Sequence, residues 1–184
     1  MLVAVAIVLG LAVLVLLYGV VTYNRLVRLR VRTENAWSQI DVQLRRRYDL
    51  IPNLVQSVKG YAEHERELFE EVAQLRTQAQ SASGVQAQAQ AENRLTGGIN
   101  RLIAVAERYP DLKASQNFLA LQEELTGTES KIAYARQFYN DTVQALNTLI
   151  QSFPSRIVAN LGGFTPREFF EIEEPARGPV SVQF

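Results

Sequence analysis

The stretch that decides the fold runs from Asn35 to Glu65 and reads NAWSQIDVQLRRRYDLIPNLVQSVKGYAEHE. In its first half, apolar residues recur at spacings of three and four, which places them on one face of a helix. Asp49 is a good N-cap and Pro52 suits a first helical turn, so a second helix is predicted to begin here. We therefore expect an antiparallel or sharply bent helix pair with a basic corner. The apolar residues of the first helix are Trp37, Ile40, Leu44 and Tyr48.

The basic corner consists of the consecutive arginines Arg45–Arg47, which fan out over much of the helix circumference. Nearby aspartates are expected to pair with them along the helix, and Glu124 or Glu129 to pair with them across helices. A buried ion pair adds little net stability but can fix the register of packed helices. We hypothesise that these arginines set the register of the bundle or of its subunits. The structural and assembly candidates are Trp37, Asp41, Arg45, Arg46, Arg47, Asp49, Phe164, Phe169 and Phe170.

The N-terminal segment from Leu2 to Thr22 is uncharged and consists almost wholly of Val, Leu, Ala and Ile. Its length of about twenty residues suffices to cross a bilayer core. A cleaved signal peptide would instead show a basic start, a shorter apolar run and a small-residue cleavage site. By the positive-inside rule, basic residues after the span predict an outer N-terminus and a cytoplasmic domain at a bacterial inner membrane. These membrane-flanking residues, which can also attract anionic headgroups, are Arg25, Arg28, Arg30 and Arg32.

The remaining chain predicts an all-α fold, in which one transmembrane helix precedes a long antiparallel helical bundle. The expected helices run from Pro52 to about Gln80, from Val85 to about Arg108, and over Leu112–Gln151. Apolar spacing in the last approaches a heptad seam, which suits a bundle or a coiled coil. Such a helix needs other helices or neighbouring subunits alongside it. The expected organisation is an anchor over residues 1–23, a bundle over 24–172, and an extended or disordered tail over 173–184.

Chemistry-bearing motifs are scarce. The chain has no cysteine and one histidine, His64. A zinc-protease motif would need a second histidine at position 68, which is leucine. We therefore expect no catalytic residue, metal or cofactor, and treat the glutamates around His64 as a solvated helix face. A membrane-anchored metal-dependent hydrolase centred on His64 and these glutamates remains the alternative.

Charge distribution also bears on partners. The net charge is zero, yet residues 23–60 hold eight Lys/Arg against three Asp/Glu, a surplus of five positive charges. Because this basic segment would be tethered at the bilayer, we expect a membrane contact and no nucleic-acid partner.

Long contiguous runs resemble the LemA family. They are TYNRLVRLR (22–30), AWSQIDVQLRRRYDLIPNLVQSVKGYAEHE (36–65), AVAERYPDLKASQNFLALQEELTGTESKIAYARQFYND (104–141), FPSRIVANLGGF (153–164) and REFFE (167–171). The resemblance implies a long-helix bundle behind one transmembrane helix, with no established enzymatic activity. It also suggests envelope quality-control proteases as partners.

The expected function is therefore a membrane-anchored helical scaffold that self-associates and organises or regulates other membrane or envelope proteins. The expected partners are the membrane, further copies of the chain, and a membrane protease or other envelope protein. Besides the hydrolase, a second alternative is a lipid-organising protein that acts through Arg25–Arg32.

Overall fold

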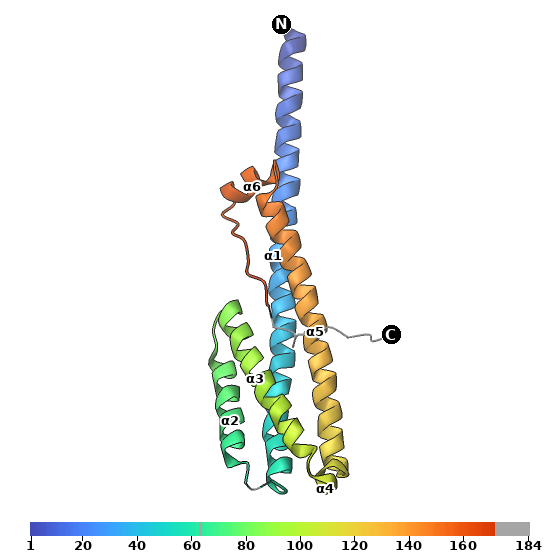
Figure 1. Cartoon of the computed structure of the whole chain (residues 1–184). Helices are drawn as coiled ribbons and strands as arrows, with labels where there is room; N and C mark the ends of the chain where they lie inside the picture. Colours follow the sequence, from blue (N-terminus) through green and yellow to red (C-terminus); the bar gives the residue numbers. More distant parts are fainter. Residues whose placement is uncertain (63, 172–184) are drawn as a thin grey trace, which may run out of the picture. The chain divides into compact units, whose positions relative to one another are not determined.

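The computed structural model describes residues 1–62 and 64–171. Over these residues the fold is all-α and contains no strand, which confirms the predicted fold class. The tail predicted over 173–184 lies outside the described residues. The helices are α1 (Leu2–Lys59), α2 (Arg66–Ser81), α3 (Val85–Ala106), α4 (Pro110–Lys113), α5 (Gln116–Gln151) and α6 (Ser155–Leu161) (Figure 1).

The chain divides into two compact units. Unit 1 combines residues 1–39 with 135–168, and unit 2 combines residues 40–134 with the described residues from Phe169 onward. The helices α1 and α5 contribute to both units. Each unit has a core of its own.

Unit 1 is built from the first part of α1, the last part of α5, and α6. In Figure 1 the two long helices run antiparallel here, and α6 lies beside α1. The stretch of α1 before Thr22 is exposed and is the one segment of the described residues that is long and apolar enough to cross a membrane. Unit 1 therefore presents the predicted N-terminal span as a free apolar helix. The core that follows the span consists of Leu26, Leu146, Ile150, Ala159 and Phe164.

Unit 2 packs the remaining part of α1 with α2, α3, α4 and the first part of α5. The helices α2 and α3 approach closely at Gly98, where an added Cβ would lie 3.0 Å from Leu75 Cδ1 and 3.4 Å from Val72 Cγ2. The seam predicted on α5 is buried within this chain at Phe118 and Leu125. The seam of this unit is thus covered by helices of its own chain. Other core residues include Ile40, Leu44, Leu54, Val58, Leu95, Leu102 and Ile132.

The predicted break at Asp49–Pro52 is wrong, because α1 continues through Pro52 to Lys59. A proline inside a helix lacks the N–H that would bond the carbonyl four residues earlier, here that of Tyr48. The Nε of Arg76, on α2, donates to this Tyr48 carbonyl oxygen at 2.7 Å. The tertiary fold thus supplies the donor that the proline removes. The chain instead turns after Lys59, in the segment between α1 and α2.

Candidate functional site

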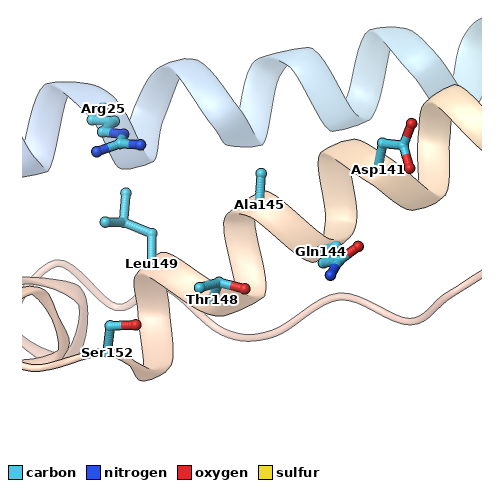
Figure 2. A pocket seen from close by; sticks show the side chains of 7 residues that line it. All are labelled: Arg25, Asp141, Gln144, Ala145, Thr148, Leu149 and Ser152. Atoms are coloured by element: carbon cyan, nitrogen blue, oxygen red, sulfur yellow. The ribbon is translucent and has the colours of Figure 1, made fainter.

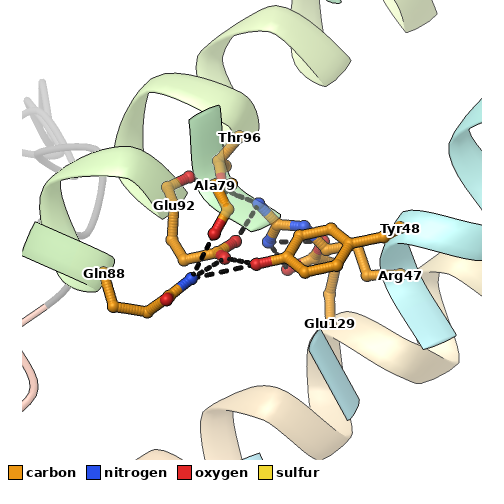
Figure 3. A network of polar contacts seen from close by, with 7 residues as sticks. All are labelled: Arg47, Tyr48, Ala79, Gln88, Glu92, Thr96 and Glu129. Atoms are coloured by element: carbon orange, nitrogen blue, oxygen red, sulfur yellow. Dashed lines mark hydrogen bonds and ion pairs between the residues drawn. The ribbon is translucent and has the colours of Figure 1, made fainter. Parts of the chain in front are cut away.

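The centre of unit 2 is the side chain of Arg47, which is 1% exposed. Its Nη1 donates to both carboxylate oxygens of Glu129, at 3.0 and 3.1 Å. Its Nη2 forms an ion pair with Glu92 Oε2 at 3.0 Å. Nη2 also donates to the Glu92 carbonyl oxygen at 3.2 Å and to Thr96 Oγ1 at 3.0 Å. One buried guanidinium therefore joins α1, α3 and α5 (Figure 3).

A second group of polar contacts surrounds the same carboxylate of Glu92. The Tyr48 hydroxyl donates to Glu92 Oε1. The Nε2 of Gln88 donates to that oxygen at 2.7 Å, and to the Ala79 carbonyl oxygen of α2 at 3.0 Å. Figure 3 shows these side chains converging from separate helices. We call the full set the Arg47 network: Arg47, Tyr48, Ala79, Gln88, Glu92, Thr96 and Glu129.

The electrostatics of the Arg47 network follow from one cation facing two carboxylates. Glu92 is fully buried, whereas the Glu129 side chain keeps 38% of its surface exposed. Burial raises the pKa of Glu129 above its ordinary value of 4.5, against the opposing pull of Arg47. Burial also raises the pKa of the Tyr48 hydroxyl, and the hydrogen bond to Glu92 adds to this effect. Tyr48 therefore stays a neutral donor to Glu92.

The neighbouring arginines make exposed ion pairs. Arg46 Nη2 lies 2.7 Å from Glu124 Oε1, and Arg45 Nη2 lies 2.7 Å from Asp41 Oδ2. Pairing of these arginines with Asp41, Glu124 and, through Arg47, Glu129 agrees with the sequence analysis. Asp49 makes no ion pair among the residues that the structure describes.

The sequence analysis missed four members of the network, Ala79, Gln88, Thr96 and Glu92, of which Glu92 is the charged one. It lies beside a segment of low complexity, and its partner Arg47 is 45 residues away in the chain. The available signal was a polar row at steps of four, in which Gln88, Glu92 and Thr96 share one face of α3. Such a row within an apolar helix indicates a buried polar contact.

A surface cavity of about 480 Å³ lies against the Arg47 network. Tyr48 and Gln88 form its inner wall, and Asp41, Arg45 and Asp49 add charged groups. The cavity is polar, and the cation that lines it, Arg45, is already paired with Asp41. Its remaining lining residues are Ala79, Gln80 and Ala82.

In unit 1, aromatic contacts hold α1 against its neighbours. The Trp37 ring lies 5.4 Å from that of Tyr139, between ring centroids. The Tyr139 hydroxyl donates to the Glu168 carbonyl oxygen at 3.0 Å, and burial raises its pKa. Trp37 thus acts as a packing residue between the long helices, as expected of a structural candidate.

The four membrane-flanking arginines differ in their surroundings. The guanidinium carbons of Arg30 and Arg32 lie 5.3 and 5.1 Å from the ring centroids of Phe164 and Phe138, at cation–π distance. Arg25 borders a second cavity, of about 500 Å³, whose opposite wall is α5 (Figure 2). Arg28 is exposed. The arginines therefore serve packing as well as surface charge. The other residues of this cavity are Asp141, Gln144, Ala145, Thr148, Leu149 and Ser152.

The three predicted phenylalanines are placed separately. Phe164 packs edge-on against Tyr23 in unit 1, with ring centroids 5.6 Å apart. Phe169 and Phe170 belong to unit 2, where Phe170 is buried and Phe169 is partly exposed. Phe164 therefore packs within unit 1, whereas Phe170 packs within unit 2.

His64, the centre of the alternative hydrolase site, is exposed in the turn between α1 and α2. Glu63, beside it, lies outside the described residues. Among the residues that are described, no group of three or more His, Asp or Glu is placed to hold a metal ion. The described geometry therefore gives this alternative no support.

Known proteins resemble this chain over most of its length. The chain is 26% identical over 180 residues to the magnetosome protein MamQ 1 of Paramagnetospirillum magneticum, covering 84% of this chain and 66% of that protein. It is 28% identical over 141 residues to protein LemA of Metamycoplasma hominis, covering 74% of this chain and 63% of that protein. The chain thus spans slightly less than two thirds of the length of these relatives. The LemA family profile matches residues 36–184, a range that contains every member of the Arg47 network. This chain belongs to the LemA family.

Proposed function

We propose that this chain is a membrane-anchored scaffold, which binds other membrane or envelope proteins or copies of itself and catalyses no reaction. The use of the charged groups in unit 2 supports this most directly. Arg47 and Glu92 form an ion pair between α1 and α3, and Arg46 and Glu124 form one between α1 and α5. Groups held in this manner join helices and stiffen unit 2, as a scaffold requires.

The proposed contact surface lies on unit 2. Scattered exposed apolar side chains are ordinary on a protein surface, but Tyr134 is a large aromatic residue with 77% of its surface exposed. Aromatic residues of this kind are enriched at the energetic centres of protein interfaces. We place the contact with a partner, such as a membrane protease or a second copy, at Tyr134.

The relatives are consistent with this proposal. Those named MamQ are magnetosome proteins, and the LemA relative carries only its family name. None of these names is that of an enzyme.

The proposal includes an orientation, with the N-terminus outside and both units on the cytoplasmic side of a bacterial inner membrane. The basic residues after the span support it. Because the chain has no cysteine, Leu2→Cys and Gln137→Cys variants can be labelled singly in intact cells with a membrane-impermeant maleimide. Labelling of Leu2→Cys alone is expected. Labelling of Gln137→Cys alone would show the opposite orientation.

Assembly is tested by mass photometry of the full-length protein in lipid nanodiscs. A uniform multimer that Tyr134→Ser dissociates, and that the matched control Tyr61→Ser leaves intact, is the expected result. A multimer that Tyr134→Ser leaves intact would show that the contact between copies does not depend on Tyr134. A monomer at every concentration would refute self-association, and crosslinking from Tyr134 in native membranes would then identify a different partner.

A further inference from the structure

The short helix α6 and the turn before it carry exposed apolar side chains. Phe153, Ile157 and Leu161 are 83%, 54% and 86% exposed. Ile157 and Leu161 are four residues apart on α6, which aligns them on one side of the helix as an apolar row, and Phe153 lies in the turn before the helix. The apolar row and Phe153 are therefore turned away from the protein.

The other sides of α6 are accounted for. Ser155 and Ala159 are buried, and Ala159 belongs to the core of unit 1 with Leu26. At 100° per residue, Arg156 and Asn160 fall between the buried side and the apolar row, and both are exposed. The helix thus has a core side, a polar side and a free apolar side.

The position of α6 within unit 1 suggests what covers the free side. An added Cβ at Gly162 would lie 3.1 Å from Tyr23 Cε2, and Phe164 packs on the Tyr23 ring. Tyr23 is the second residue after the apolar stretch of α1. Figure 1 shows α6 beside α1 where the free N-terminal part of that helix ends. The helix α6 therefore lies beside the end of the apolar stretch that the proposed anchoring places in the hydrocarbon core.

From this placement we propose that α6 is a second membrane-contacting element, whose Ile157 and Leu161, with Phe153 before them, insert into the lipid interface beside the span. The inference rests on the proposed membrane anchoring. Its occupant is the bilayer, because α6 lies beside α1 where the exposed apolar part of that helix ends. Amphipathic helices lie in the interfacial plane with their apolar side in the acyl boundary and basic residues at the headgroups. Arg156 on α6 and the exposed Arg28 on α1 supply such charges.

The inference has a structural consequence for the unit. A single span lets the continuous helix α1 tilt in the bilayer, whereas a second contact on one side of that helix restricts the tilt. Insertion of α6 would therefore fix the tilt of unit 1 against the membrane surface.

Site-directed spin labelling tests the proposal on the full-length chain in vesicles of phosphatidylethanolamine and phosphatidylglycerol. The absence of native cysteine allows single labels in Ile157→Cys and Leu161→Cys. Gln137→Cys, an exposed position of unit 1 on α5, is the aqueous control. Leu14→Cys, within the span, is the lipid control. Power saturation then compares access of oxygen, which concentrates in lipid, with access of a polar nickel chelate.

The expected result is high oxygen access and low nickel access at positions 157 and 161, as at position 14, with the reverse at position 137. Nickel access at 157 and 161 equal to that at 137, with 14 still in lipid, would overturn the inference and leave the anchor intact. Low access to both reagents at 157 and 161 would also overturn it, since protein rather than lipid would then cover the row. Nickel access at position 14 would refute the anchoring itself.

Discussion

Replacement of Arg47 by methionine tests whether the Arg47 network holds unit 2 together. The Arg47→Met change keeps a long side chain but removes the only cation that meets Glu92 among the described residues. The Glu92 carboxylate is 0% exposed, so it would stay buried without its counter-charge. Removal of one partner from a buried ion pair costs about 3–5 kcal/mol.

The matched control is the adjacent residue. Arg46→Met removes an ion pair with Glu124 whose side chains are 47% and 44% exposed. Exposed pairs contribute about 0.2–1 kcal/mol. The two variants change the same residue type to the same replacement on one helix, so they differ mainly in the burial of the pair.

Thermal unfolding in detergent, followed by far-UV circular dichroism, measures both effects. For a chain of this size, 1 kcal/mol corresponds to about 2–4 °C in Tm. Arg47→Met should therefore lower Tm by about 6–20 °C, and Arg46→Met by at most about 4 °C. Equal shifts in the two variants would refute the reasoning.

A double variant separates a lost ion pair from a packing defect. Replacement of a buried pair by apolar residues of similar volume is often neutral. Arg47→Met combined with Glu92→Leu should therefore recover most of the Tm that Arg47→Met loses. A double variant less stable than the single one would show that packing, or the loss of the Glu92 acceptor for Tyr48 and Gln88, outweighs the orphaned carboxylate.

Three further predictions follow from individual contacts. Arg76→Leu should lower the free energy of unfolding by about 1–3 kcal/mol, because the Tyr48 carbonyl loses its donor. Pro52→Ala restores a backbone N–H for that carbonyl, so the double-mutant cycle should show that most of this cost disappears in the Pro52→Ala background. Additive effects of the two changes would contradict the idea that Arg76 replaces the missing backbone donor. Gly97→Ala should stabilise the protein by about 0.5–1 kcal/mol in urea unfolding, because the Cβ that alanine adds meets nothing within 4 Å. Gly98→Val should destabilise it by about 1–3 kcal/mol, because an added Cβ there already lies 3.0 Å from Leu75 Cδ1. Since burial raises the pKa of Glu129 above 4.5, the folded state binds that proton more tightly, and the stability from this group falls as pH rises from about 4.5 through the folded-state pKa. A pH series of Tm should show the wild type losing stability relative to Glu129→Gln over that interval, and parallel curves would contradict it.

Local chemistry in the sequence predicted much of the fold. The break before Val85 follows from the small residues that precede it, and Pro110 separates α3 from α5 as expected. The start of α3 and the end of α5 agree with the predicted residues. These features depend on neighbours in the chain, which the sequence shows directly.

The misplaced helix end at Pro52 has a different cause. The donor that compensates for this proline is Arg76, which acts on a residue 28 positions away. No local pattern reveals a donor that only tertiary packing supplies. Asp49 and Pro52 form a good start signal, yet the apolar side of α1 continues through Leu54 and Val58, and burial of that side prevails.

Only part of the candidate site was predictable, because some of its contacts depend on tertiary packing. Arg46 and Arg47 stood out by their adjacency, and Glu124 and Glu129 were correctly expected as partners across helices. Glu92 was not, because nothing in its own segment marks it as the residue that meets a buried guanidinium. Burial distinguishes Arg47 from Arg46, and burial depends on how several helices meet.

The long sequence separation inside the Arg47 network also constrains the biogenesis of the protein. Arg47 and Glu129 are 82 residues apart, which at common synthesis rates of 5–20 residues per second is a delay of about 4–16 s. During this interval the anchor can already have entered the membrane while Arg47 has Glu92 but still lacks Glu129. Until α5 has left the ribosome, the nascent chain must therefore keep the Glu129 side of this arginine hydrated and the side of α1 that packs on α5 uncovered. Slow translation between these two residues would lengthen the period in which the half-made domain depends on chaperones.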